Sequence, residues 1–221
     1  MIAQWSNAFA AAVFCAAAAT CGAQTYFDLW FEAPESVSAG DTFTVEVWAG
    51  ASGLFVNDGL NISLFHSLLM SVEVSGDLDS LASISPATIH TNFALNTGAP
   101  TENWLVDVMA FNLLDFGFDP DNPMHLFSFD VSTTTMGRGT LTFNAHPSST
   151  GPDMLWWFVQ PPTGDSFYIG SADDASVLTA NPFAVRVIPA PAGVAILALG
   201  GVASLRRRRS FQSGSLRAIS R

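Results

Sequence analysis

A two-residue hydrophobic period runs through most of this chain and constrains its fold more than any other feature. Neighbouring side chains of a strand point to opposite faces of a sheet, so short alternating segments predict strands that are buried on one face. The breaks between these segments are rich in Gly, Pro, Asn and Asp, which favour turns. The alternating sets are Phe27, Leu29 and Phe31; Phe43, Val45 and Val47; Leu60, Ile62 and Leu64; Val72 and Val74; Trp104, Val106 and Val108; Phe127, Phe129 and Val131; Leu141 and Phe143; and Phe183, Val185 and Val187.

Helices are expected to contribute little to the body of the protein. Only Ser80 to Ile89 is compatible with a short helical turn, and no stretch of the body shows a convincing amphipathic helix. Eight or more strands without interleaved helices predict an all-β fold, an antiparallel β-sandwich over residues 24–188.

Two stretches narrow this architecture. Val37 to Val47 contains a Gly-Asp turn that leads into an alternating strand, and Leu126 to Phe143 reads as an apolar strand, a turn at Gly137 to Gly139 and a second apolar strand. Both stretches resemble parts of cohesin-like and carbohydrate-binding-module-like sandwiches. The resemblance implies a jelly-roll or cohesin-like β-sandwich, and it identifies no ligand-binding residue.

The N-terminal segment, residues 1–23, has the properties of a secretory signal peptide. Ala8 to Ala19 is continuously apolar and too short to span a bilayer, and small residues precede a cleavage position at Gln24. A lipoprotein with Cys21 or Cys15 as the acylated residue is the alternative. Both cysteines of the chain lie in this segment, so the mature body is expected to have no disulfide and no cysteine nucleophile.

The charge of the chain is strongly asymmetric. All 19 acidic residues lie between residues 24 and 188, where Arg138 and Arg186 are the only basic side chains, so this body carries a net charge of −17 with histidine neutral. Such a body is not expected to bind nucleic acid by neutralising phosphates. It is suited to solubility or to attracting divalent cations.

The C-terminal segment combines a proline pair, a short apolar run and a basic cluster. Pro189, Ala190 and Pro191 precede Ala192 to Leu205, which as a helix would be ~21 Å long and therefore short for a hydrocarbon core of ~30 Å. Arg206, Arg207, Arg208 and Arg209 would hold that end in the cytoplasm. The run is therefore expected to act as a transient stop during export. A core helix with a solvated basic cluster is the alternative.

This segment resembles the PEP-CTERM sorting signal of exported bacterial proteins, with Ala190 at the position of the usual glutamate. The resemblance covers residues 189–209, and Ser210 to Arg221 is expected to form a disordered tail beyond it. It implies recognition by an exosortase, a membrane protease, after transient anchoring of the apolar helix in the inner membrane. It also implies delivery to the cell surface or to an exopolysaccharide matrix.

One acidic loop is a candidate calcium site. Asp115, Asp119, Asp121 and Asn122 gather three carboxylates and an amide, whereas calcium takes six to eight oxygen ligands. The spacing does not match an EF-hand. A solvated loop is the alternative. Weaker candidates are Asp77 with Asp79 and Asp173 with Asp174. No other cofactor is expected.

A run of aromatic residues is a candidate glycan-binding site. In a strand, Trp156 and Trp157 point to opposite faces, so one is expected to be buried and the other to face outward. An outward tryptophan beside Tyr168 would stack on sugar rings. The alternatives are that loops cover this second face or that Trp157 contacts another chain.

Catalytic motifs are absent from the sequence. His66, His90, His125 and His146 match no metal or nucleophile spacing, and His125 is expected to continue the face of Phe127 and Phe129 as a packed residue. A secreted hydrolase with a pair of carboxylates remains an alternative, since their separation is set in space. We expect an exported, non-catalytic surface or matrix protein with a structural or adhesive role.

Overall fold

The computed structural model describes residues 24–53, 56, 62–91, 93–112 and 122–190. The signal segment, the apolar run from Ala192, the arginine cluster and the three carboxylates Asp115, Asp119 and Asp121 all lie outside these residues. In the part of the chain that is described, no helix is long and apolar enough to cross a membrane.

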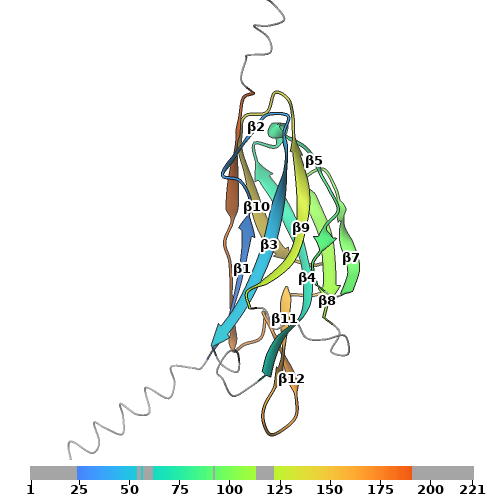
Figure 1. The fold of residues 1–221 in the computed structure, drawn as a ribbon, viewed down its shortest axis with the longest axis vertical. Coiled ribbons are helices and arrows are strands. Elements are labelled where there is room, and N and C mark those ends of the chain that lie inside the picture. Colours follow the sequence, from blue (N-terminus) through green and yellow to red (C-terminus); the bar gives the residue numbers. More distant parts are fainter. Residues whose placement is uncertain (1–23, 54–55, 57–61, 92, 113–121, 191–221) are drawn as a thin grey trace, which may run out of the picture.

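The described residues form strands and one short 3₁₀ turn (Figure 1). The turn, η1, spans Leu78–Ser80. The helical turn expected at Ser80 to Ile89 overlaps η1 only at Ser80, and most of that stretch forms strands, so this expectation is wrong. The strands are β1 (Thr25–Glu32), β2 (Ser36–Ser38), β3 (Thr42–Gly53), β4 (Ile62–Gly76), β5 (Leu81–Ile84), β6 (Thr88–Ile89), β7 (Phe93–Pro100), β8 (Trp104–Phe111), β9 (Met124–Thr133), β10 (Gly139–Pro147), β11 (Leu155–Gln160), β12 (Phe167–Gly170), β13 (Ser176–Ala180) and β14 (Phe183–Ile188).

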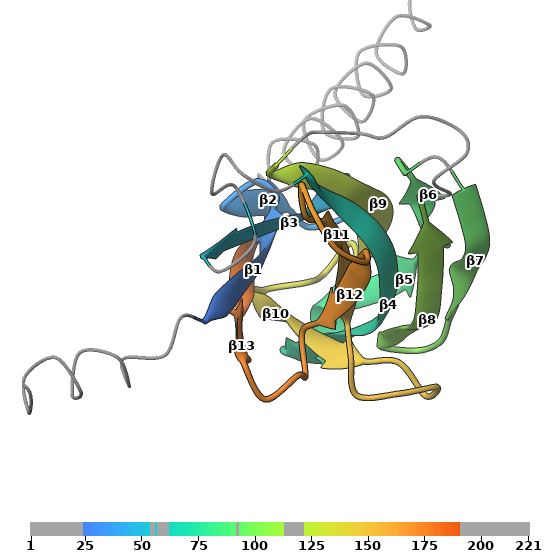
Figure 2. The ribbon, with the colours of Figure 1, turned by 90° about the horizontal axis from the view of Figure 1, so that it is seen from below.

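Two sheets face each other and enclose the core, which confirms the predicted β-sandwich (Figure 2). The six-stranded sheet has the order β13-β1-β3-β9-β5, and β6 also pairs with β9. The eight-stranded sheet has the order β12-β11-β4-β10-β14-β2. Its long strand β4 also pairs with β8, and β8 pairs with β7, so these two strands form one flank of the molecule.

Two parallel pairs depart from the predicted antiparallel arrangement. β1 pairs in parallel with β13, and β14 pairs in parallel with β2. In each sheet the parallel pair joins an early strand to a late one, because the chain crosses to the other sheet between β1 and β2 near its start and between β13 and β14 near its end. The first and last strands of the body therefore run side by side in the same direction along one side of the sandwich.

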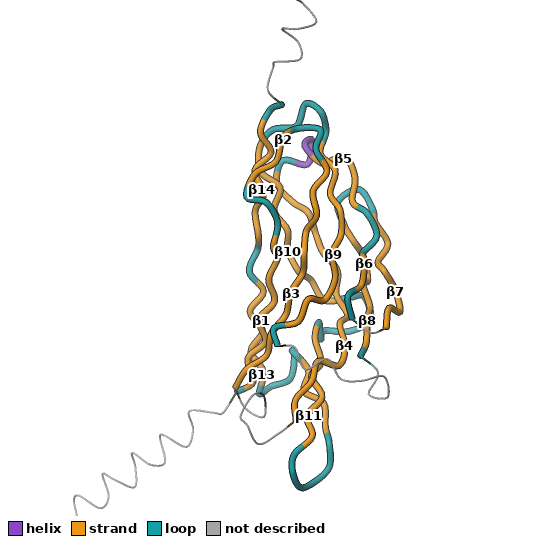
Figure 3. The backbone as a smooth tube through the Cα atoms, viewed as in Figure 1, coloured by secondary structure: helices purple, strands orange, loops and turns teal. Residues whose placement is uncertain are grey.

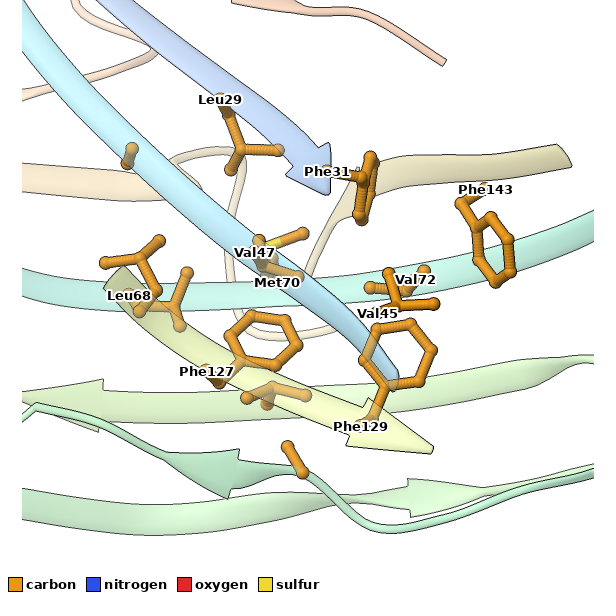
Figure 4. Packing of buried hydrophobic residues seen from close by; sticks show 14 of the residues in the cluster. Leu29, Phe31, Val45, Val47, Leu68, Met70, Val72, Phe127, Phe129 and Phe143 are labelled. Carbon is orange, nitrogen blue, oxygen red and sulfur yellow. The ribbon is translucent and has the colours of Figure 1, made fainter. Parts of the chain in front are cut away.

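The core is built from the alternating sets that the sequence predicts in β1, β3, β9, β10 and β14 (Figure 4). The ring centroid of Phe143 of β10 lies about 6 Å from those of Phe31, Phe43 and Phe129. Because the body contains no disulfide, its stability must come from the hydrophobic core, and a core of this size can supply it.

In β4, β8 and β9 a β-bulge shifts the two-residue period by one, so that the buried face changes along each of these strands. In β8 the bulge lies at Asp107, which has a φ of 56°. Asp107 donates its N–H to Ser71 Oγ (3.0 Å), and its carboxylate accepts bonds from the N–H and hydroxyl of Ser149 (2.7 and 2.6 Å). As a result Leu105 and Val108 are buried, while Trp104 and Val106 are only half-buried. The prediction of one face for Trp104, Val106 and Val108 is therefore wrong.

A second bulge divides β4. In the pairing of β4 with β11, Trp156 lies opposite Ser67 and Trp157 lies opposite Phe65. His66 is therefore an extra residue on β4. Before it, Phe65 points into the core and Leu64 points outward; after it, Leu68 and the even-numbered residues that follow point inward. Leu64 therefore lies on the opposite face from Val72 and Val74, although the sequence pattern placed them in one series.

The β11–β12 hairpin projects beyond one end of the sandwich (Figures 1 and 3). The start of β1 lies toward this end, whereas β14 ends at the opposite one (Figure 1). The described chain continues from there through the exposed Pro189 and Ala190. The described chain therefore ends at the end of the sandwich farthest from the hairpin.

Candidate functional site

The outer face of the six-stranded sheet carries four aromatic side chains in a row. Trp30 of β1 and Trp48 of β3 lie opposite each other, with parallel rings 6.5 Å apart. The ring of His125 stacks on Trp48 at 4.4 Å, and that of His90 stacks on His125 at 4.0 Å. We call these four residues the aromatic row. Trp48 Nε1 and His125 Nε2 are buried without a hydrogen-bond partner.

The third bulge places His125 in this row. Val47 pairs with Phe127 and Trp48 pairs with His125, so Leu126 is the extra residue of β9. Leu126 and Phe127 both point into the core, and His125 is moved to the outer face. The expectation that His125 continues the face of Phe127 and Phe129 is therefore wrong. Burial, and then the proximity of His90, hold the pKa of His125 below its ordinary value, while Glu46 and Glu32 oppose this shift.

The same face is acidic. The strands of the six-stranded sheet contain Asp28, Glu32, Glu46 and Asp130 but no lysine and no arginine. These four carboxyl groups alternate with the core residues and therefore share the outer face with the aromatic row. Glu32 accepts a bond from Trp30 Nε1 (3.1 Å), and Asp130 accepts one from Thr44 Oγ1 (2.7 Å). Among the described residues none of the four forms an ion pair, so their charge is uncompensated.

A hollow of about 280 Å³ opens beside Trp30, where Gly50 stands opposite Asp28. We call it the Gly50 hollow. Trp30 and Pro123 border it, and a Cβ added to Gly50 would lie 3.8 Å from both of them. Asn122 closes one side, since its amide exchanges two hydrogen bonds with the backbone of Ala51 (3.1 and 2.7 Å). The volume is near the lower limit of ~300 Å³ for small-ligand sites.

The residues of the predicted glycan site lie on the projecting hairpin, and the structure separates them. Trp157 is buried in the core, at 1% exposure, with its ring 5.4 Å from Phe65 and 6.0 Å from Phe27. Its side chain therefore does not reach a surface ligand, which corrects its assignment to the site. Trp156 is half-buried and covers Gly170, and Tyr168 is 50% exposed.

Tyr168 belongs to a second aromatic group, on the outer face of the hairpin and the adjoining part of β4. Its ring lies 4.5 Å from that of His66 and 5.5 Å from that of Phe158. We call Trp156, Phe158, Tyr168 and His66 the hairpin surface. Leu64 and Phe158 are buried here, at 5% and 7% exposure, although they lie outside the main core. Burial holds the pKa of His66 below its ordinary value.

Of the candidate calcium ligands only Asn122 lies within the described residues, and its Oδ1 accepts a hydrogen bond from the N–H of Ala51. The weaker candidates stabilise turns: Asp77 accepts a bond from the N–H of Thr140 (2.9 Å), and Asp173 accepts one from the N–H of Gly170 (2.7 Å). In the described part of the chain, no three His, Cys, Asp or Glu side chains are arranged to hold a metal ion.

One carboxyl group on β8, that of Asp107, has a perturbed pKa. Hydrogen bonds from the hydroxyl and N–H of Ser149 hold the pKa of Asp107 below its ordinary value. These hydrogen bonds stabilise the bulge of β8. A carboxyl group with a lowered pKa is poorly suited to donating a proton, as the general acid of a glycoside hydrolase must do.

The aromatic row was not predicted from the sequence, although part of its signal is visible there. Trp30 and Trp48 occupy the outward positions of two strands whose inward positions are fully apolar, and tryptophan at an outward position is unusual unless it meets a partner or a ligand. His90 and His125 give no such signal. Their positions depend on strand pairing across β3, β9 and β6 and on the bulge at Leu126.

No protein-family model and no curated protein matches this chain. Among solved structures, it is similar to the sixth cohesin of scaffoldin B from Acetivibrio cellulolyticus, solved in complex with a dockerin, at 12% identity and a TM-score of 0.42, covering 73% of this chain and 99% of the cohesin. It is also similar to a CARDB domain from Pyrococcus furiosus, solved with two metal ions, at 14% identity and a TM-score of 0.32, covering 76% of this chain and 96% of that domain. The β-sandwich is established here by the strand pairing of the chain itself.

Proposed function

We propose that this protein is an exported bacterial surface or matrix protein, non-catalytic and adhesive, that an exosortase-type system sorts through its C-terminal segment. The observation that carries the proposal is the exit of the chain at one end of the sandwich, with the hairpin at the other (Figure 1). While residues 189–209 anchor the body transiently in the membrane, the hairpin surface would face away from the membrane.

The surface chemistry supports a binding role. Apolar patches exposed on the surface of monomeric proteins often mark interaction sites, and exposed aromatic side chains contribute to such patches. Here one group lies on the face of a sheet and the other on a projecting hairpin. A net charge of −17 on the body would keep the exported domain soluble and away from anionic lipid.

Fractionation and intact mass test the sorting. We expect the protein in the surface or matrix fraction, with a mass that begins near Gln24 and ends between Pro189 and Gly193. In cells without the exosortase it should stay in the inner membrane with residues 206–221 attached. Finding the full tail on surface-located protein would refute exosortase sorting, and a cytoplasmic location would refute export.

A second candidate function is glycan binding by the hairpin surface, and the exposure of Tyr168 beside His66 favours it. Aromatic rings of this kind stack on the apolar faces of sugar rings. Affinity electrophoresis in gels that contain the extracellular polysaccharide of the host should retard the protein. Tyr168→Ala should weaken the retardation, whereas Met136→Ala, which removes an exposed side chain in the turn between β9 and β10, should preserve it. Equal mobility of all three proteins with and without polysaccharide would reject this function.

A further inference from the structure

We propose that the Gly50 hollow and the adjoining Trp30 bind a polysaccharide that carries protonated amino sugars. The site lies on the six-stranded sheet, separate from the hairpin surface, and the proposal deepens the adhesive function on which it rests. Its partner is defined by chemistry: a sugar ring that contacts indole and an ammonium group that meets carboxylates.

The hollow exists because of one residue. Gly50 is an outward-facing position of β3, opposite Asp28, and the absence of a side chain there leaves space between Trp30 and Pro123. The backbone of Gly50 shows no positive φ, so its conformation does not require glycine. A strand interior normally favours a β-branched residue, and glycine there often marks a close approach by another group.

Polar groups line the hollow on the side of Asp28. Its carboxylate and the hydroxyl of Ser52 are both exposed at the rim. The amide of Asn122 is already used by the backbone of Ala51, so it shapes the wall and does not compete for a ligand. An aromatic wall with an acceptor-rich rim matches a sugar, which presents an apolar face and a polar edge.

Charge selects the kind of sugar. The sheet face around the hollow carries the carboxyl groups of Asp28, Glu32 and Glu46 without any lysine or arginine. A uronic acid or a sulfated sugar would be repelled there, whereas an ammonium group would be attracted by these carboxylates and by the indole ring. The extended face along the aromatic row gives room for a chain of sugars rather than a single unit.

Calorimetry on the purified full-length protein in mild detergent tests the site, with the hexamers of glucosamine and N-acetylglucosamine as probes at pH 6. We expect the glucosamine hexamer to bind at least tenfold more tightly, because acetylation removes its positive charge. Raising the NaCl concentration from 50 to 500 mM should weaken its binding severalfold, since the carboxylates are exposed to solvent.

Gly50→Val should reduce the affinity for the glucosamine hexamer at least tenfold by filling the hollow. Its Cβ meets Asn122 Oδ1 at 3.3 Å, which a shift of a few tenths of an ångström relieves. Gly151→Val is the matched control, because a Cβ at Gly151 meets nothing within 4 Å. Should Gly50→Val unfold, Asp28→Asn tests the same site without changing its shape. Asp28→Asn should remove most of the preference for the amine, and Asp165→Asn, in the exposed hairpin loop, should not.

Three outcomes would overturn the proposal: no binding of the glucosamine hexamer, equal binding of both hexamers, or unchanged binding by Gly50→Val and Asp28→Asn. Binding of a tetra-arginine peptide with no binding of either sugar would assign the site to a basic protein partner instead. Because localisation is measured separately, a protein found at the surface that binds no amino sugar refutes this site alone, and the adhesive function is then left to the hairpin surface.

Discussion

The hairpin surface and the aromatic row contain similar residues but differ in what surrounds them. On the hairpin surface, Tyr168 and His66 lie against Phe158 and help to bury an apolar cluster on the outside of the sheet. On the six-stranded sheet, the aromatic row stands among uncompensated carboxylates and beside the Gly50 hollow. The strands of the hairpin contain no charged residue at all.

This difference teaches that grouped aromatic residues do not by themselves identify a ligand site. What the rings cover and what surrounds them decides their role. The hairpin uses its outer rings for packing, because Leu64 and Phe158 are buried among them on the outer face. The six-stranded sheet is already stabilised by the core beneath it, so its outer rings are available for another purpose.

The largest expected effect is a loss of stability, and it compares the buried Trp157 with the half-buried Trp156. Trp157→Ala should lower the free energy of unfolding by about 3–5 kcal/mol, because it leaves a cavity between Phe27 and Phe65. Trp156→Ala, at a half-buried position, should cost less than half as much. Urea denaturation followed by circular dichroism measures both. Equal losses would mean that Trp156 is as important for packing as Trp157.

A smaller effect should distinguish the two surfaces directly. Phe158→Ala should cost about 2–3 kcal/mol of unfolding free energy, somewhat below the range for core phenylalanines, because the hairpin can relax around the gap. Trp30→Ala should cost about 1 kcal/mol, the contribution of one stacked pair on an open face. Similar midpoints of urea unfolding for the two variants would contradict the larger packing contribution that we assign to the hairpin surface.

The smallest effect is a pH dependence that both surfaces share. His66 and His125 have pKa values below the ordinary 6.5, so the unfolded chain binds more protons than the folded protein at mildly acidic pH. Their contribution to stability is complete above about pH 6.5 and is lost as the pH falls through the folded pKa values. Thermal unfolding between pH 8 and pH 5 should show this decline. His66→Gln and His125→Gln should each flatten it, and an unchanged profile in both variants would show that other groups cause it.

Much of the fold could be predicted because apolar residues that alternate in the sequence form the buried face of a strand in the structure. Phe27, Leu29 and Phe31, like Phe127, Phe129 and Val131, are buried as their alternation predicts. The prediction failed where a bulge adds one residue, at Asp107, at His66 and at Leu126. Each bulge depends on how two strands pair, and hydrogen bonds such as those between Asp107 and Ser149 connect residues far apart in the sequence.

The candidate site could be predicted only in part for the same reason. The sequence identified Tyr168 and the Trp156–Trp157 pair but not which indole faces outward, since that choice depends on the partner strand. The Asp119 loop and the Pro189–Arg209 sorting segment remain predictions from the sequence, because their decisive residues lie outside those that the structure describes.

The sequence by itself predicted seven of the strands (β1, β3, β4, β8, β9, β10 and β14), the acidic and thiol-free character of the body, and the two terminal segments that indicate export, because each of these is a property of neighbouring residues. Only the tertiary structure decided that Trp30, Trp48, His125 and His90 form one row, that Gly50 opens a hollow opposite Asp28, and that Trp157 belongs to the core. The physical reason is that pairing register and bulges, which select the face of every side chain, arise between strands that are distant in the chain.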